Sequence, residues 1–289
     1  MSIDRNTFKL LRIPFSFFLM PLFLFALSQA ETIVVFKAVV SFIIIHLLVY
    51  PASNGYNSYV DKDETPIGGL EKPPMPTKAL FYVTLVMDGL SLALSFTLIN
   101  SLFAGCVLLY TLASRAYSSK QIRLKKYPFI SFLVVILFQG AFTYYMAHIG
   151  ITSNTLTLNK FTMFLLLGCS FQIAGAYPLT QIYQHQQDYK EGIITLSYKL
   201  GYRGTFIFTA IMFFICNVFY FLHFNLIDRV NNFYIIQVFF LPIVVYFAYW
   251  FYMVYKDVTK ADFKHTMRMN TVASICMNAC FITLYFINK

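Results

Sequence analysis

The chain has 289 residues, of which 58% are apolar and only 12% are charged. Its mean hydropathy is +0.65. A soluble domain carries about 25% charged residues, so this composition excludes a soluble globular protein and predicts an integral membrane protein. The net charge of +10 is typical of cytoplasmic loops in membrane proteins, and no nucleic-acid partner is expected.

Apolar windows of about 20 residues, enough to cross a hydrocarbon core of about 30 Å, recur along the chain. They predict nine transmembrane helices near residues 12–30, 32–52, 79–98, 100–117, 128–148, 161–182, 204–224, 232–254 and 269–287. Ser28-Gln29-Ala30 has some likeness to a signal-peptidase site, but eight spans follow, so we interpret the first span as a retained helix. The predicted fold class is all-α: one polytopic membrane bundle over residues 1–289.

The basic residues are distributed unevenly between the two sides of this bundle. Of the 22 Lys and Arg residues, 18 fall in the N-terminus or in the loops after the second, fourth, sixth and eighth spans. The positive-inside bias therefore places the N-terminus and these loops in the cytoplasm. We expect a multi-pass protein of a bacterial inner membrane.

Two polar segments repeat one another at a constant offset, so that the stretch 50–64 aligns without a gap on the stretch 177–191. The matched pairs are Asn54 with Gln181, Asn57 with Gln184, Asp61 with Asp188 and Glu64 with Glu191. On continuous helices, this spacing keeps the four groups within roughly 80° of one face. The repeat predicts two related halves, in which the second and third spans correspond to the sixth and seventh.

Amides and carboxylates on two helices, beside a basic rim, are suited to a magnesium–diphosphate ligand. Mg²⁺ prefers oxygen ligands and is typically held by one or two carboxylates together with substrate phosphates. Lys and Arg side chains bind the remaining phosphate oxygens. Loss of diphosphate from a prenyl diphosphate leaves an allylic cation, which aromatic faces stabilise. The alternative interpretation is that the acidic residues are ordinary solvated side chains at helix ends.

These residues resemble the UbiA superfamily of intramembrane prenyltransferases over nearly the whole chain. Asn57 through Asp61 is similar to the start of that family's N-x-x-x-D-x-x-x-D motif, and Asp188 through Gly201 resembles its D-x-x-x-G-x-x-T-L-x-x-x-L-G signature. The segments 72–77 and 117–126 resemble the loops that follow the second and fourth spans in that family. Two positions depart from the family pattern: Thr65 stands where an acid is expected, and Gln184 replaces the first acid of the second motif.

The resemblance implies transfer of an isoprenoid from a prenyl diphosphate donor to an apolar or aromatic acceptor, with Mg²⁺ as cofactor and the bilayer as surroundings. It implies catalytic roles for Asp61, Asp188 and Asn57. The expected metal ligands are Asp61, Asp188, Asp63, Glu64 and Glu191, and the expected donor-binding residues are Asn54, Gln184, Gln181, Lys120, Arg123 and Lys190.

Two other functions remain open at this stage. Thr65 and Gln184 are consistent with a catalytically silent protein that binds prenyl diphosphates or lipids, and internal repeats also occur in small-molecule transporters. Asp88, near the middle of the third span, is either a functional group or a protonated acid hydrogen-bonded within the bundle. Gly68 and Gly69, with the Pro-rich segment that follows, are candidates for a lid over the site.

Overall fold

The protein is almost entirely helical. The computed structural model describes residues 4–289, and this range contains no β-sheet, only an isolated bridge between Ile67 and Leu70. In chain order, the helical segments are α1 (Arg5–Leu11), η1 (Ile13–Leu19), α2 (Pro21–Gln29), α3 (Val35–Ile43), η2 (Ile44–Val49), α4 (Tyr50–Asp61), α5 (Lys78–Leu94), η3 (Ser95–Ile99), α6 (Ser101–Ser118), η4 (Leu124–Lys126), α7 (Pro128–Ile136), η5 (Leu137–Phe142), α8 (Thr143–Thr152), α9 (Lys160–Gln181), η6 (Ile182–Gln184), α10 (His185–Lys190), α11 (Leu196–Leu226), α12 (Val230–Lys256), η7 (Val258–Lys260) and α13 (Phe263–Ile287).

Several of these segments join end to end into longer helices. Within the described residues, eight such helices are long and apolar enough to cross a membrane. They cover Arg5–Gln29, Val35–Asp61, Lys78–Ile99, Pro128–Thr152, Lys160–Lys190, Leu196–Leu226, Val230–Lys256 and Phe263–Ile287. The remaining predicted span corresponds to α6, which has 18 residues and carries Arg115 near its end. The predicted all-α membrane bundle is therefore confirmed, and the chain is an integral multi-pass membrane protein.

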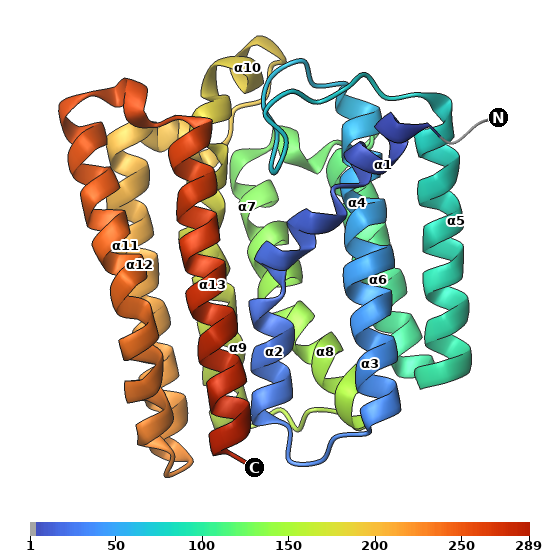
Figure 1. Cartoon of the computed structure of the whole chain (residues 1–289), viewed down its shortest axis with the longest axis vertical. Helices are drawn as coiled ribbons and strands as arrows, with labels where there is room; N and C mark the ends of the chain where they lie inside the picture. The colour runs from blue at the N-terminus through green and yellow to red at the C-terminus, as the bar shows by residue number, and fades with distance from the viewer. Residues whose placement is uncertain (1–3) are drawn as a thin grey trace.

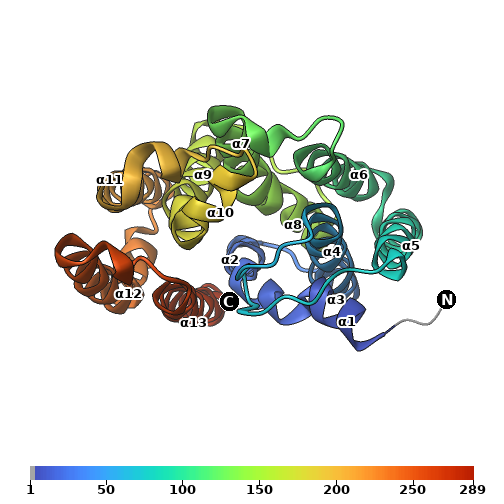
Figure 2. The same ribbon diagram turned by 90° about the horizontal axis from the view of Figure 1, so that it is seen from above.

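The long helices pack around a shared interior. Contacts between neighbouring helices run from α2 to α13 and then to α12, α11 and α9. From α9 they run through η5, α7, α6 and α4 back to η1. Figure 1 shows the long helices standing side by side, with α1, α10, the 62–77 loop and the α12–α13 connection all at one end. Seen from above in Figure 2, α5 lies at one edge of the bundle and α11 and α12 at the other. The segments expected to share one side of the membrane thus lie at one end.

The first long helix is interrupted where its sequence disfavours a regular helix. Arg12 adopts a left-handed conformation with φ 48° and ends α1. Pro14 and Pro21 lie in the first turns of η1 and α2. Proline is tolerated there, because the backbone N–H that it lacks would have no partner within the helix. The break directs the Arg12 side chain into the bundle instead of along a helix surface.

The long helix Pro128–Thr152 contains a π-helical turn, η5, that presents Gln139 to the interior. Gly140 in this turn has φ −98° and ψ −105°. A Cβ at Gly140 would lie 2.6 Å from the Cα of Ser170 on α9. Only glycine allows the two helices to approach this closely, and π-turns of this kind often occur at functional sites.

An aromatic cluster fills the interior between α2, α8, α11 and α13. The Phe25 ring stacks on Phe281 at a centroid distance of 4.3 Å and meets the edges of Tyr144 and Tyr220. All four side chains are almost fully buried. This packing holds together the helices from the two ends of the chain.

Candidate active site

A polar cavity of about 150 Å³ lies at the end of the bundle where α4, α9 and the 62–77 loop converge. Both repeated segments contribute to it. Its lining residues are Arg12, Asn57, Asp61, Asp63, Ile67, Gly68, Tyr117, Lys125, Tyr177, Thr180, Gln181, Gln184, Asp188, Glu191, Ile193 and Thr195. The structure therefore brings Asp61 and Asp188 into one cavity, as the repeat predicts.

The first acidic segment enters the cavity from the end of α4. Asn57 accepts a hydrogen bond of 2.7 Å from the Ser118 hydroxyl, which fixes its amide. Asp61 is the last residue of α4, because Lys62 turns left-handed with φ 56°. Asp63 follows in the loop and lines the cavity, whereas Glu64 is not among the lining residues.

The structure does not bring Glu64 to the cavity with the other acids: its side chain is exposed. The expectation for Glu64 assumed that the helix continues through residue 64, whereas α4 ends at Asp61. Beyond that point the helical spacing no longer determines direction, so the pairing of Glu64 with Glu191 does not extend to the structure.

The second acidic segment is bent but still faces the cavity. Helix α9 contains Pro178 and ends at Gln181; η6 and the short helix α10 then change its direction. Gln184 donates a 3.2 Å hydrogen bond to the Pro66 carbonyl, which leaves its own amide oxygen free. Asp188 and Glu191 complete this side of the cavity. His185 points away and lies 2.8 Å from the Ser197 hydroxyl.

Three basic side chains accompany these acids. Lys125 forms a buried ion pair with Asp61, and Arg123 approaches Glu191 at 3.7 Å. Arg12 donates hydrogen bonds of 3.2 Å to the carbonyls of Gly68 and Asn54, and its Nε is buried without a partner. It forms no ion pair within residues 4–289, so a buried cation is available to an anionic ligand.

Two of the basic residues expected in the site lie elsewhere. Lys120 and Lys190 are exposed and line none of the cavities described here. Both residues flank the motifs in the sequence, which is why they were expected in the site. Lys125 is one of several basic residues in its loop, and Arg12 is one of three in the N-terminal segment. Nothing in the linear pattern marks either residue, because each reaches the cavity through a turn of the backbone.

Asp63 is held in an unusual protonation environment. Burial, and secondarily the negative charge of Asp61, raises the pKa of Asp63 to about 6. A negative charge on Asp63 is costly in a cavity that holds three further acids, so a bound cation would stabilise the charged form of Asp63.

Two larger spaces adjoin the polar cavity and share lining residues with it, and we name each after a residue that lines only that space. The Phe138 space, of about 180 Å³, shares Arg12, Asn57, Tyr117 and Tyr177 with the polar cavity and extends toward Phe138. The Asn270 space, of about 240 Å³, shares Tyr177 and Thr180 with the polar cavity and lies between η1, α9, α11, α12 and α13. Tyr177 therefore lines all three spaces.

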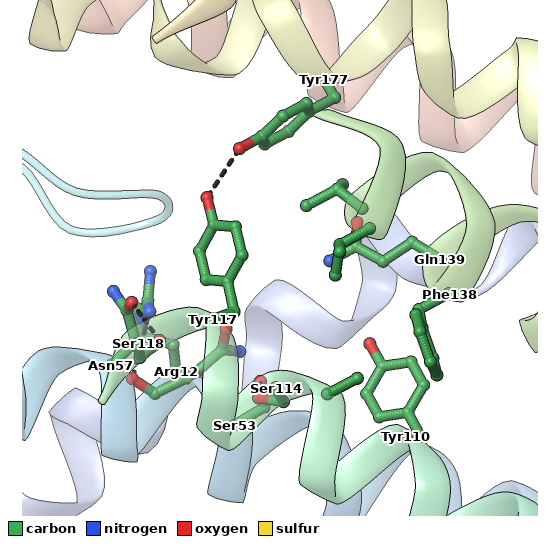
Figure 3. Close-up of a pocket in the computed structure, with 14 residues that line it drawn as sticks. Arg12, Ser53, Asn57, Tyr110, Ser114, Tyr117, Ser118, Phe138, Gln139 and Tyr177 are labelled. Carbon is green, nitrogen blue, oxygen red and sulfur yellow. Dashed lines mark hydrogen bonds between the residues drawn. The ribbon is translucent and has the colours of Figure 1, made fainter. Parts of the chain in front are cut away.

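A pair of tyrosines stands at this junction. The hydroxyl oxygens of Tyr117 and Tyr177 are 2.6 Å apart, and Tyr177 also accepts a 2.9 Å hydrogen bond from Gln181. Figure 3 shows the two rings meeting end to end, with Asn57, Ser118 and Arg12 on one side and Gln139 on the other. Tyr177 therefore borders the polar cavity and both larger spaces, and Tyr117 borders the polar cavity and the Phe138 space.

The 62–77 loop covers part of the site. Ile67 and Gly68 line the polar cavity, and the loop is attached by the hydrogen bonds from Gln184 to Pro66 and from Arg12 to Gly68. Gly69 has φ 84°, which suits glycine and lets the loop turn between Ile67 and Leu70.

Asp88 belongs to a different cluster. It forms an ion pair with Arg115, whose guanidinium lies 4.0 Å from the centroid of the Tyr56 ring. Asp88 lines none of the three spaces. Its position within the membrane is accounted for by this contact between α5 and α6.

Comparison with known proteins identifies the family. The profile of the UbiA prenyltransferase family matches residues 18–272. The chain belongs to the UbiA prenyltransferase family. No curated protein sequence shows significant similarity to it.

Solved UbiA structures share the fold of this UbiA family member at low sequence identity. A UbiA homolog from Archaeoglobus fulgidus bound to GPP and Mg²⁺ is 17% identical, with a TM-score of 0.72 over 97% of this chain and 99% of that chain. The same homolog bound to DMAPP and Mg²⁺ is 16% identical, with a TM-score of 0.71 over 98% and 99%. An apo UbiA homolog from Aeropyrum pernix K1 is 15% identical, with a TM-score of 0.71 over 94% and 98%. The family and the fold inferred from the sequence are thus confirmed.

Proposed function

We propose that this UbiA family member transfers a prenyl group from a prenyl diphosphate to an apolar acceptor inside the membrane. The observation that carries the proposal is the single cavity in which Asp61 and Asp188 from two repeated segments meet Arg12 and Lys125. The A. fulgidus homolog, solved with prenyl diphosphates and Mg²⁺, supports the same ligands for this chain.

The residues that line the polar cavity fit a magnesium ion that they would hold together with the diphosphate of the substrate. Asp61 keeps one buried carboxylate oxygen, Oδ1, without a hydrogen-bond partner, which is an available ligand atom. No group of three or more His, Cys, Asp or Glu side chains within residues 4–289 is arranged to hold a metal ion. Mg²⁺ commonly takes one or two carboxylates and completes its shell with water and phosphate oxygens, so this donor set suits ions bridged by a diphosphate.

We assign the ligand roles from the cavity lining. Asp61 and Asp63 on one side, and Asp188 and Glu191 on the other, would hold the ions, while Asn57, Gln184 and Gln181 contribute amide groups. Gln184 supplies an oxygen but no charge, so it weakens the second motif relative to an acid. Asn54 borders the two larger spaces and would contact the donor beyond its diphosphate. Glu64 is left out of this assignment.

The basic residues would bind the diphosphate directly. Arg12 offers a buried guanidinium with an unpaired Nε, and Lys125 and Arg123 offer cations that now neutralise Asp61 and Glu191. When metal ions bind the carboxylates, these cations become free to turn toward phosphate oxygens. We assign no such role to Lys120 and Lys190, which are exposed outside the cavity.

The reaction then follows from the position of the donor. The bond between C1 of the prenyl group and the bridging oxygen breaks, and its electron pair leaves with the diphosphate. Bound Mg²⁺ would stabilise the negative charge that develops there. Tyr117, Tyr177, Tyr110 and Phe138 present rings beside the path of the chain, where they shield and stabilise the allylic cation. An electron pair of the acceptor bonds to C1, and the acceptor's proton passes to an oxygen of the released diphosphate.

We further propose that the end bearing this site faces the cytoplasm of a bacterial cell. The support is the concentration of Lys and Arg in the segments at that end. The related-halves interpretation also stays a proposal: both repeats reach the same cavity, but the second is bent at Pro178 and η6, unlike the first.

The experiment separates turnover from silent binding. Purified protein is incubated with Mg²⁺, an acceptor panel and geranyl, farnesyl or geranylgeranyl diphosphate, and pyrophosphate release is measured. We expect release that requires Mg²⁺ and is lost in Asp61→Asn and in Asp188→Asn. Glu64→Gln is the matched control, since it removes an acid of the same segment outside the cavity, and should retain activity.

Two outcomes would contradict the proposal. Unchanged release in both Asp61→Asn and Asp188→Asn would exclude the metal-assisted mechanism. Donor-dependent thermal stabilisation without any release would instead favour the silent binding protein, which Gln184 makes the strongest alternative. Uptake of substrate into liposomes without release would favour a transporter.

A further inference from the structure

The Asn270 space contains polar groups but no charged residue, and this limits what can occupy it. Beside Tyr177, its polar lining comes from Asn54, Gln139, Gln172, Thr180, Asn270 and Ser274, and the other lining residues are apolar. Of the three adjoining spaces it is the one without Arg12.

Several of its polar groups lack partners. Asn270 and Ser274, one turn apart on α13, have no side-chain hydrogen bond to any residue in the range 4–289; Ser274 is 4% exposed, whereas Asn270 is only half-buried. The Asn54 amide nitrogen is buried without a partner. Gln172 accepts a bond from Tyr220 but keeps its own amide donors. Buried polar groups are normally paired, so these are suited to a ligand with neutral hydrogen-bonding groups.

The polar groups of the neighbouring Phe138 space are more often paired with one another. Many of its polar groups already pair with one another: Ser53 with Ser114, Ser118 with Asn57, and Tyr117 with Tyr177. The Phe138 space also shares more lining residues with the polar cavity than the Asn270 space does. A hydrocarbon chain there leaves these paired groups satisfied, whereas in the Asn270 space it would also cover the amide donors of Gln172 at a cost in free energy. The unpaired Asn54 amide lines both spaces and does not distinguish them.

We propose that the Asn270 space is the acceptor site, and that it selects acceptors whose buried end is uncharged and carries a hydroxyl or carbonyl group on an apolar body. This inference rests on the proposed prenyl transfer and deepens it, because the donor chain then occupies the Phe138 space. Tyr177 and Gln139 border both spaces, so the two substrates meet there. Carboxylate and phosphate acceptors are excluded, since removing an anion from water without a cationic partner is costly.

A matched pair of probes tests the selection by charge. 1-Naphthol and 1-hydroxy-2-naphthoate share one ring system and hydroxyl group and differ by a single carboxylate. Binding is measured by the thermal shift of the full chain in detergent with EDTA and no donor, so that neither metal nor turnover is needed. We expect 1-naphthol to bind at least about tenfold more tightly. Equal or tighter binding of the acid would overturn the proposal.

Variants locate the binding. Asn270→Leu and Ser274→Ala should each weaken 1-naphthol binding about three- to tenfold, the effect of losing one hydrogen bond. Thr283→Val on the same helix is the control, because Thr283 bonds only to the Ala279 carbonyl and lines none of the three spaces. If 1-naphthol binding is unchanged in both variants, or falls equally in Thr283→Val, the site assignment is wrong.

The introduction of charge provides a gain-of-function test. Asn270→Arg should reverse the preference, so that 1-hydroxy-2-naphthoate binds more tightly than 1-naphthol. An unaltered preference in a folded Asn270→Arg protein would contradict the assigned site. Failure of the two proposals can be told apart. Selective naphthol binding without pyrophosphate release keeps a site for neutral ligands in the Asn270 space but removes the transferase, and with it the acceptor role of that space. Release with carboxylate acceptors supports the transferase and overturns the selection by charge.

Discussion

The buried pair of Lys125 and Asp61 offers a direct test of the site, because it stands where a metal ion is expected. The two side chains are 10% and 5% exposed. Replacing Lys125 by Met leaves Asp61 charged in a cavity that also holds Asp63, Asp188 and Glu191. Removing one partner of a buried pair typically costs about 3–5 kcal/mol. For a chain of this size the expected fall in melting temperature is roughly 6–10 °C.

Magnesium should reverse much of this loss. In EDTA, the Lys125→Met protein should unfold at the lower temperature by circular dichroism or by a thiol-reactive dye. With saturating MgCl2, the ion supplies the missing positive charge beside Asp61, so the difference from wild type should shrink to half or less. Lys126→Met is the matched control: Lys126 is exposed and adjacent in sequence, and such a change usually alters stability by less than about 0.5 kcal/mol.

Two results would contradict the proposed roles of Lys125 and Asp61. If MgCl2 leaves the Lys125→Met deficit unchanged, the carboxylates around Asp61 do not form a cation site. If Lys126→Met is destabilised equally, the loss reflects the loop and not the ion pair.

Three further predictions concern pH, packing and orientation. Because the pKa of Asp63 is raised to about 6, its neutral form stabilises the metal-free protein as pH falls through this value, and the stabilisation is lost above it. Metal binding needs the carboxylate, so the Mg²⁺-dependent thermal shift should decline between about pH 7 and pH 5. Asp63→Asn should bind more weakly and show less of this decline; a pH profile identical to wild type would contradict the role of Asp63. Gly140→Ala should destabilise the fold by about 1–3 kcal/mol, because its Cβ meets the Ser170 backbone at 2.6 Å. Gly105→Ala, where nothing lies within 4 Å, should be neutral or slightly stabilising in the same melts. A cysteine at exposed Lys120 should react with an impermeant maleimide only in inverted vesicles, and one at Asn154 only in right-side-out vesicles; the reverse pattern would overturn the proposed orientation.

The local sequence determined much of what this protein is. The membrane bundle follows from long apolar windows, because a helix that crosses lipid must satisfy its backbone internally and expose apolar side chains. The family follows from short motifs around Asp61 and Asp188, whose chemistry demands fixed residue types. Even the meeting of the two acidic segments is predictable from their repetition and from the parity of the spans.

What the sequence could not determine depends on where each helix ends and turns. Glu64 has the right spacing but leaves the cavity, because Lys62 ends α4 in a left-handed conformation. Arg12 reaches the cavity because of a break in the first helix, and Lys125 because its loop folds back over Asp61. The neutral character of the Asn270 space is likewise a tertiary property, since its walls come from helices that are distant in sequence. Periodicity specifies the faces of continuous helices; caps, breaks and packing decide which side chains meet.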